Sequence, residues 1–220
     1  MNMQKQHEKK YPQSADFKLR DLATANFPHA KTLLDLGCGS GGNLKMFRGI
    51  GFDCIGITLS PEEKNEASKH APVLIHNLEE GLPNNLNQRF DLVLAAHVLE
   101  HIFYPEKLLQ DIKRVGTQGA IIVIPNLLFW RNRVKLLLGI FEYSNLGIMD
   151  YTHCRWYTYK SIQRILATYG FEVLQAEATG GLFQRKSSIF RVIDGFLLKT
   201  FPGIFGFQFY IVVKIYNDTD

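Results

Sequence analysis

The chain has 220 residues, of which 46% are hydrophobic and 21% charged, and its formal net charge is +4. These values are typical of a soluble globular protein, and so mild a charge gives no support for a nucleic-acid partner. Three cysteines without a C-x-x-C spacing argue against a disulfide framework and fit a reducing compartment. The polar first residues contain no apolar signal segment, so we expect a cytoplasmic protein.

Short apolar runs alternate with amphipathic segments over residues 31–126. Strands are expected at KTLLDLG (31–37), FDCIGIT (52–58), VLIHN (73–77), FDLVLAA (90–96) and GAIIVIPN (119–126), and helices at NLKMFRGIG (43–51), SPEEKNEASKHA (60–71) and PEKLLQDIKRVG (105–116). Ser60, Pro61 and Glu63 have the N-cap, first-turn and capping-box pattern of a helix start. Nearly all-apolar strands between helices predict a parallel sheet that is covered on both faces.

The alternation of strand and helix patterns stops after residue 126. LLFWRNRVKLLLG (127–139) is predicted to be helical, residues 142–158 irregular, and YKSIQRILATYG (159–170) a helix before two last strands. The prediction is an α/β fold with a doubly wound, mainly parallel, seven-stranded Rossmann-like sheet, helices on both faces and an antiparallel last strand. One domain is expected over 1–220, with an N-terminal helical segment (1–30), a cofactor-binding half (31–126), a lid (127–158) and a C-terminal part (159–220).

The apolar segment 195–213 raises the question of a membrane span, but Lys199, Pro202 and Gly203 interrupt it. It is therefore predicted to be a helix end, a loop and a strand. Peripheral contact with lipid stays open, because basic and apolar side chains are also mixed in residues 129–138. Neither segment predicts a helix that crosses a bilayer.

LDLGCGSGG (34–42) contains a G-x-G-x-x-G pattern between a strand and a helix, the context of a nucleotide-cofactor loop. Asp35 separates the ligand choices, because a carboxylate at the carboxyl end of the strand would repel a pyrophosphate. It would attract an ammonium group, and S-adenosylmethionine carries one at its amino-acid end. Glycines let the backbone approach that part of the ligand.

Five stretches together carry a family resemblance: LLDLGCGSGG, GITLSPEE, NLEEGLPN, FDLVLAAHVLEHIFYPEKLLQDIKRV and GAIIVIPN. In order and spacing the chain resembles a class I S-adenosylmethionine-dependent methyltransferase, within the small group that includes the MetW-like and methyltransferase type 11/23 domains. The resemblance covers residues 32–126, and a weaker match extends it to about residue 173. It implies that S-adenosyl-L-methionine is the cofactor.

The resemblance also implies roles for individual positions. Position 58 normally carries an acid for the ribose hydroxyls, but this chain has Thr58, as do cyclopropane-fatty-acid synthase-like methyltransferases, so the departure does not imply inactivity. Asn77 and Leu78 match the adenine edge, and small residues after the fourth strand leave room for the sulfonium. The implied cofactor-binding residues are Asp35, Gly37, Cys38, Gly39, Thr58, Leu59, Asn77, Leu78, Ala95 and His97.

HVLEH (97–101) also fits H-x-x-E-H, a helical zinc-peptidase motif, because His97 and His101 would share one face of a helix. The zinc interpretation needs a third ligand, which the sequence does not reveal, so no metal is expected. The resemblance places this block at the methyl-transfer site instead. Candidate general bases are His101 and His153, with Tyr104 as a positioning hydroxyl.

Candidate acceptor-binding residues follow the fifth strand and continue in the lid: Asn126, Asp150, Arg155 and Trp156. The predicted function is methyl transfer to a small-molecule, lipid or saccharide-linked acceptor, mainly by alignment and exclusion of water. A non-catalytic cofactor-binding partner or assembly protein is the alternative that Thr58 leaves open. A nicotinamide-dependent oxidoreductase is disfavoured by Asp35 and by the missing acid at position 58. The acceptor and the oligomeric state are not predicted.

Overall fold

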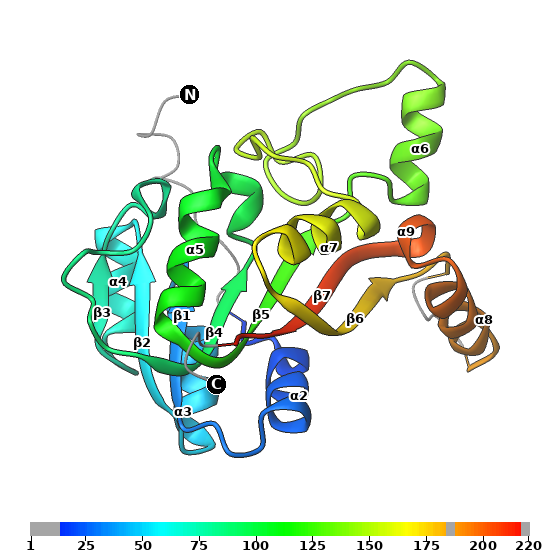
Figure 1. Cartoon of the computed structure of the whole chain (residues 1–220). Helices are drawn as coiled ribbons and strands as arrows, with labels where there is room; N and C mark the ends of the chain where they lie inside the picture. The colour runs from blue at the N-terminus through cyan, green and yellow to red at the C-terminus, as the bar shows by residue number, and fades with distance from the viewer. Residues whose placement is uncertain (1–13, 184–187, 217–220) are drawn as a thin grey trace.

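The computed structural model describes residues 14–183 and 188–216 (Figure 1). One seven-stranded sheet lies at its centre, in the order β3-β2-β1-β4-β5-β7-β6. The first five strands pair in parallel, whereas β7 runs antiparallel to both β5 and β6. The strands are β1 (Thr32–Leu36), β2 (Asp53–Thr58), β3 (Val73–Ile75), β4 (Phe90–Ala96), β5 (Gly116–Pro125), β6 (Glu172–Gly180) and β7 (Gly206–Lys214). The predicted sheet and its antiparallel last strand are confirmed.

Helices cover both faces of the sheet and enclose two cores. One core holds apolar side chains of α5 and α7, and the other those of α2, α3 and α4. The helices are α2 (Phe17–Asn26), α3 (Gly42–Gly49), α4 (Pro61–Ala67), α5 (Pro105–Val115), α6 (Trp130–Leu137), α7 (Tyr159–Thr168), α8 (Ser188–Thr200) and α9 (Pro202–Phe205), with 3-10 turns η1 (Leu78–Glu80) and η2 (Leu99–His101). α2 lies within the predicted N-terminal helical segment, of which residues 1–13 fall outside the described residues.

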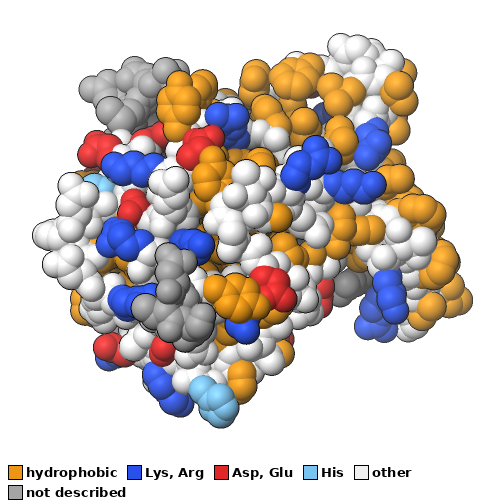
Figure 2. Space-filling view, in the orientation of Figure 1, with side chains coloured by type: hydrophobic (Ala, Val, Ile, Leu, Met, Phe, Trp, Pro, Cys, Tyr) orange, Lys and Arg blue, Asp and Glu red, His pale blue; other side chains and the backbone are white. Residues whose placement is uncertain are grey.

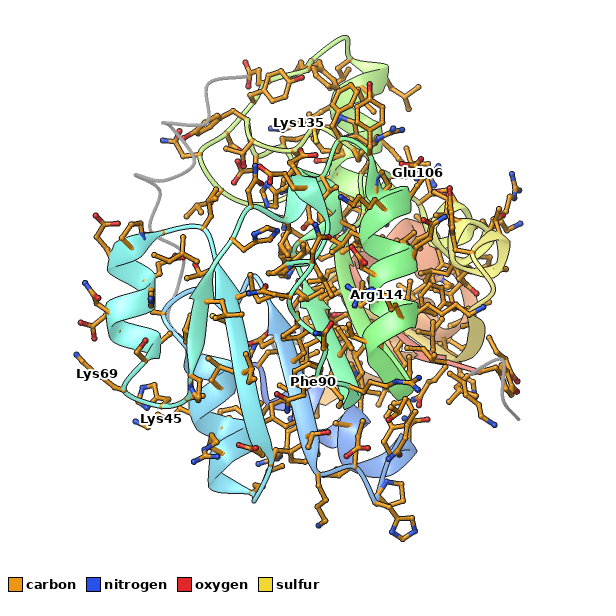
Figure 3. The ribbon with its side chains drawn as sticks, turned by 60° about the vertical axis from the view of Figure 1, so that its left-hand side comes forward. Lys45, Lys69, Phe90, Glu106, Arg114 and Lys135 are labelled. Atoms are coloured by element: carbon orange, nitrogen blue, oxygen red, sulfur yellow. The ribbon has the colours of Figure 1, made fainter. Side chains whose placement is uncertain are left out.

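The sequence signals explain where two of these helices form. α4 begins as predicted, because the Ser60 hydroxyl accepts a hydrogen bond from the Glu63 N–H (3.3 Å) and Pro61 takes the first turn. The apolar stripe of α5 is buried, and Figure 3 shows Glu106 and Arg114 along this helix. Burial of that stripe against β4 and β5 fixes the carboxyl end of β4, where the HVLEH block begins.

The HVLEH block is not the helix that was predicted. His97 has a left-handed backbone (φ 57°), and only the 3-10 turn η2 follows it. The helix α5 starts later, at Pro105, because the residue before a proline is driven out of the α conformation. His97 and His101 therefore do not share a helix face, and the zinc-peptidase interpretation loses its geometric basis.

The chain leaves the sheet after β5. α6 and the irregular segment 138–158 lie above the sheet in Figure 1, and Figure 3 shows Lys135 on α6. Segment 195–213 forms the end of α8 and the strand β7 as predicted, with the short helix α9 between them where a loop was predicted. Within residues 14–183 and 188–216, every helix is too short or too polar to cross a membrane.

Candidate active site

A cavity of about 870 Å³ opens at the carboxyl ends of β1, β2 and β4. Open α/β sheets bind ligands at this edge, and the volume is that of a pocket for a cofactor together with a small acceptor. Its walls come from the glycine loop, the end of β2, the segment after β3, the HVLEH turn and the lid segment. The following predicted site residues line it: Gly37, Cys38, Gly39, Thr58, Leu59, Asn77, Leu78, His97, His101, Asp150 and His153.

Three of the other predicted residues are held elsewhere by identifiable contacts. The Tyr104 side chain is 65% exposed and packs edge-on against Phe103, at the start of α5. Arg155 donates a hydrogen bond to the Phe103 carbonyl oxygen (2.8 Å), and Trp156 packs behind His153. None of the three lines the cavity, so the roles predicted for them as catalytic or acceptor residues lack the required placement.

Asn126 was predicted to bind the acceptor, but its side chain is fully buried in a structural clamp. The amide donates to the carbonyl oxygens of Gly203 (3.1 Å) and Gly206 (2.8 Å) and accepts from the Leu128 N–H (3.0 Å). Ala95 is fully buried as well and faces the core beneath α5, because successive strand residues point to opposite faces. Its neighbour Ala96 lines the cavity in its place.

The glycine loop requires glycine at its first position. Gly37 has φ 67°, and a Cβ atom there would come within 2.8 Å of Val98 Cγ2. The turn therefore depends on the missing side chain both for its conformation and for the close approach of the HVLEH turn. Gly39 is also left-handed, with φ 52°. Together they present bare backbone to the cavity.

Asp35 lies behind this loop, in β1, and is almost fully buried (1% exposed). It does not line the cavity, so direct contact with a ligand's ammonium group is not what the geometry offers. Its Oδ2 atom has no hydrogen-bond partner among the described residues. Burial raises the pKa of this carboxyl from 3.8 to about 7. The site therefore carries a buried acid that a neighbouring positive charge would ionise.

The second strand ends in a pairing that the sequence prediction missed. The Thr58 hydroxyl donates to Oε2 of Glu63 at 2.8 Å, and both residues line the cavity with Leu59. Glu63 was assigned to a capping box, but its carboxylate turns to Thr58 while its N–H bonds Ser60. A carboxylate thus stands beside position 58, supplied by the first turn of α4.

Residues after β3 form the wall next to this pair. The Asn77 side chain accepts a hydrogen bond from the Glu79 N–H (3.1 Å) and so caps the turn η1. His76 bonds the Gly81 carbonyl oxygen through Nε2 (3.0 Å), which fixes its ring as a further lining residue. Leu59 and Leu78 provide the apolar surface against which a flat base could pack.

Four titratable side chains meet at the HVLEH turn. Glu100 is 1% exposed, and its Oε1 lies 3.1 Å from His97 Nδ1 and 4.0 Å from His153 Nε2. Burial opposes ionisation of Glu100, but the hydrogen bond and charge of His97 outweigh it and hold the pKa of Glu100 below its usual value. Burial lowers the pKa of His101, so its ring is neutral at pH 7. The His101 and His153 rings meet edge to face, with centroids 4.7 Å apart.

His97 is held in a conformation that few side chains adopt. It is the one non-glycine residue of the described chain with a positive φ. Such strain persists only where the surroundings impose it, and it concentrates at functional sites. Here the His97 N–H donates to the Val123 carbonyl oxygen (2.9 Å), while the ring bonds Glu100.

The segment before α2 closes the cavity near the glycine loop, which sequence reasoning also missed. The Asp16 N–H donates to Asn43 Oδ1 (3.0 Å), and the Tyr210 hydroxyl donates to Asp16 Oδ2 (2.6 Å). Asp16, Asn43 and Tyr210 all line the cavity. Asp16 gave one signal, since an aspartate before an apolar-periodic segment is a helix N-cap. Tyr210 gave none, because a strand pattern does not reveal which side chain reaches a loop far away in the sequence.

Comparison with known families decides what kind of domain carries this site. A family model described as a methyltransferase domain matches residues 5–176. The chain belongs to this methyltransferase family. Among curated proteins, the methyltransferase domain is similar to norajmaline N-methyltransferase of Rauvolfia serpentina, with 40% identity over 43% of this chain and 35% of that protein. It is also similar to the chloroplastic tocopherol O-methyltransferase of Arabidopsis thaliana, with 33% identity over 43% of this chain and 29% of that protein.

The matched part of the methyltransferase domain therefore spans only about a third of these curated relatives. Solved structures share its fold over most of its length. An Archaeoglobus fulgidus S-adenosylmethionine-dependent methyltransferase superposes with a TM-score of 0.64, at 21% identity, over 90% of this chain and 91% of that chain. Magnesium protoporphyrin IX methyltransferase from Synechocystis, with S-adenosylhomocysteine bound, superposes with a TM-score of 0.62, at 15% identity, over 91% and 81%.

Proposed function

We propose that this protein transfers a methyl group from S-adenosyl-L-methionine to a small-molecule acceptor. The observation that carries the proposal is one cavity that is lined by two chemically different groups of residues. The bare glycine turn and the Thr58–Glu63 pair form the first group, and the histidines of the HVLEH turn and the lid form the second. The first group suits a cofactor, and the second suits an acceptor.

The residues of the first group fit the cofactor. Gly37 and Gly39 leave room for its amino-acid part, and the Glu63 carboxylate can accept hydrogen bonds from the ribose hydroxyls. The adenine would pack between Leu59 and Leu78. Asp35 would act on the ammonium group from behind the loop, since the field of a charge reaches further in a low-dielectric interior.

The chemistry asks for alignment more than for acid–base catalysis. The bound cofactor supplies an activated methyl group: the bond from sulfur to the methyl carbon breaks, and a lone pair of the acceptor forms the new bond. The walls of the cavity hold the acceptor behind the methyl group and exclude water. Where the acceptor must lose a proton, the neutral imidazole of His101 is placed to take it.

The acceptor class is the finer part of the proposal. Relatives named for an alkaloid N-methyl and a tocopherol O-methyl transfer support a small organic acceptor. A lipid- or saccharide-linked acceptor remains within the proposal, because the lid carries exposed apolar side chains at positions 138, 140, 141, 143 and 146. These can contact an acceptor that extends beyond the cavity.

A second apolar surface, over α6 and α8, supports peripheral contact with an anionic membrane. Exposed apolar side chains gather over α6 and α8, with basic residues among them, at the right of Figure 2. Arg131 and Lys135 lie on α6, Arg191 and Lys199 on α8, and the one acid of α8, Asp194, is buried and accepts the Leu182 N–H. Such a face is complementary to anionic headgroups. Binding to phosphatidylserine vesicles but not to phosphatidylcholine vesicles would support this contact, whereas a stable dimer without vesicle binding would contradict it.

Calorimetry and turnover test the main proposal. We expect S-adenosylmethionine and S-adenosylhomocysteine to bind with one site per chain, and NAD not to bind. Release of S-adenosylhomocysteine is then measured with secondary amines, phenols and lipid-linked sugars as acceptors. Binding without turnover on any of them would favour the alternative, a non-catalytic cofactor-binding partner, and NAD binding in its place would overturn both.

A further inference from the structure

A cluster of metal-ligating side chains spans the HVLEH turn and the lid segment. Glu100 and His101 belong to η2, and His153 comes from the segment 138–158. One possible ligand atom from each residue lies within 4.8 Å of the other two. Nitrogen and oxygen donors around one transition-metal ion lie about 3–4 Å apart, so small movements of the three side chains would complete the set.

Hydrogen bonds fix both imidazole rings in the tautomer that a metal ligand needs. His153 Nδ1 lies 2.9 Å from the Ile148 carbonyl oxygen, which can only accept, so Nδ1 carries the proton. The Thr152 hydroxyl donates to Asp150 Oδ1 (2.7 Å) and therefore accepts from His101 Nδ1 (3.1 Å). In both rings Nε2 then holds the lone pair. A second-shell bond that orients the other ring nitrogen is typical of metal-binding histidines.

Glu100 provides an independent observation. It is 1% exposed, and its Oε2 atom has no hydrogen-bond partner among the described residues. The ion pair with His97 accounts for Oε1 alone. A buried carboxylate oxygen without a partner is unfavourable, and a cation beside it would remove that penalty.

We propose that Glu100, His101 and His153 bind a divalent transition-metal ion beside the group of cavity residues that suits an acceptor. Two imidazoles and one carboxylate favour Zn²⁺, Mn²⁺, Fe²⁺ or Co²⁺ over Mg²⁺ and Ca²⁺, which prefer oxygen ligands alone. Three protein ligands leave coordination positions open toward the cavity, which His101 and His153 both line. This set differs from the zinc-peptidase pattern that the sequence analysis rejected, because His97 pairs with Glu100 and the lid supplies the third ligand.

The proposal rests on the proposed function only for the chemistry of the acceptor. An acceptor with two neighbouring oxygens could occupy the open positions. With Nε2 of His101 bound to the metal, that ring is no longer free to act as a base, so the acceptor hydroxyl would release its proton to solvent at neutral pH, because a bound cation lowers the pKa of a coordinated hydroxyl. The oxygen lone pair then forms the bond to the methyl carbon as the bond to sulfur breaks. The site thus selects oxygen acceptors that chelate.

The test uses the full chain after treatment with a chelator. Calorimetry with Zn²⁺, Mn²⁺ and Mg²⁺ measures stoichiometry, and Co²⁺ loading gives visible absorption bands that report nitrogen and oxygen ligands. We expect one transition-metal ion per chain, a loss of affinity of at least about a hundredfold in His153→Ala and Glu100→Gln, and about a ten- to hundredfold loss in Thr152→Val. The exposed His29→Ala is the matched control and should bind as the wild type does.

Near-UV circular dichroism shows whether each variant keeps its fold. If His153→Ala does not fold, Glu100→Gln still tests the site, because glutamine has nearly the same shape as glutamate. Absence of stoichiometric binding, or equal binding in His153→Ala and His29→Ala, would overturn the metal site. These measurements do not include turnover, so a failure of the metal site would not count against the proposed methyl transfer. That proposal is tested separately, by cofactor binding. Conversely, a chain that binds Co²⁺ but not S-adenosylhomocysteine would support the metal site alone.

Discussion

The Thr58 hydroxyl donates to the Glu63 carboxylate over 2.8 Å, at the point where β2 meets α4. The position that lacks an acid in the sequence thus has one beside it in space. An N-cap hydroxyl, a first-turn proline and a carboxylate three residues later orient the start of α4 so that Glu63 reaches back over the end of β2. The carboxylate that position 58 lacks is thus supplied by Glu63 of the following helix, α4.

If Glu63 binds the ribose, removal of its carboxylate should weaken the binding of the cofactor. We expect Glu63→Gln to reduce the affinity for S-adenosylhomocysteine about tenfold and Glu63→Ala more, because hydrogen bonds to a charged group contribute roughly 1.5–3 kcal/mol. Calorimetry checks this. Glu66→Ala, an exposed residue of the same helix paired with Lys69, is the control and should change nothing. Unchanged affinity in both Glu63 variants would leave the ribose to other partners.

The buried carboxyl of Asp35 should make the free energy of unfolding depend on pH. Its folded pKa of about 7 lies above 3.8, so the native state binds the proton more tightly than the unfolded chain. Burial of the carboxyl therefore destabilises the folded protein increasingly as the pH rises from 4 to 7. Asp35→Asn removes this destabilisation, and we expect its gain in unfolding free energy to grow between pH 5 and pH 8, toward ~4 kcal/mol as an upper limit. Chemical denaturation at the two pH values measures it.

The same variant should lose the pH dependence of cofactor binding. In the wild type, S-adenosylhomocysteine should bind more tightly at pH 8 than at pH 6, since its ammonium group favours ionised Asp35; in Asp35→Asn the two affinities should be equal. Asp91→Asn provides the opposite control. Backbone hydrogen bonds from Lys31 and Thr32 overcome burial and lower the pKa of Asp91, so this variant should be destabilised at pH 8. A wild type that binds equally at both pH values would contradict the role given to Asp35.

A comparison of Gly37 with Gly49 tests whether the backbone conformation at Gly37 requires glycine. Gly37→Ala places a Cβ atom 2.8 Å from Val98 Cγ2 at φ 67°, so we expect a loss of about 1–3 kcal/mol in unfolding free energy and weaker cofactor binding. Gly49→Ala at the end of α3 meets nothing within 4 Å and should be neutral or stabilising by up to about 1 kcal/mol. Thermal and chemical unfolding compare them. Equal effects at the two sites would refute a special requirement at Gly37.

Asn126 should prove structural. Removal of its side chain in Asn126→Ala leaves the carbonyls of Gly203 and Gly206 and the Leu128 N–H without their buried partner. We expect a loss of about 2–4 kcal/mol in unfolding free energy, with cofactor affinity unchanged well below the melting temperature. The exposed Asn84→Ala should remain within about 0.5 kcal/mol of the wild type. A stable Asn126→Ala that loses acceptor turnover alone would restore the acceptor-binding role.

The fold was predictable because its signals are local and repeated. The apolar stripe Leu108, Leu109, Ile112 and Val115 is buried as its period requires, and the Ser60–Pro61 signal starts α4 where expected. The helix predicted for HVLEH was wrong for a local reason as well. The proline at position 105 and the reversal at His97 together outweigh a pattern that otherwise fits a helix.

The site was predictable only where residues that are neighbours in the sequence form one wall of the cavity. The glycine loop lines the cavity as one continuous stretch, whereas Tyr210 reaches Asp16 across 194 positions and Glu63 reaches Thr58 through a turn. Asn126 shows the reverse error. Its place at the carboxyl end of β5 suggested ligand binding, but the approach of α9 and β7, which no local pattern reveals, occupies both N–H donors of its amide.

The backbone carbonyl oxygen of Glu100 accepts hydrogen bonds from the N–H groups of both Cys154 (2.9 Å) and Arg155 (3.1 Å). The later limb of segment 138–158 is thereby anchored to the HVLEH turn. Its earlier limb is bounded by Gly139 and Gly147, both of which have a left-handed backbone and no atom within 4 Å of the position of an added Cβ. We therefore expect acceptor preference to diverge through this earlier limb, so that grafting residues 139–147 from another member would exchange selectivity while donor recognition stays intact.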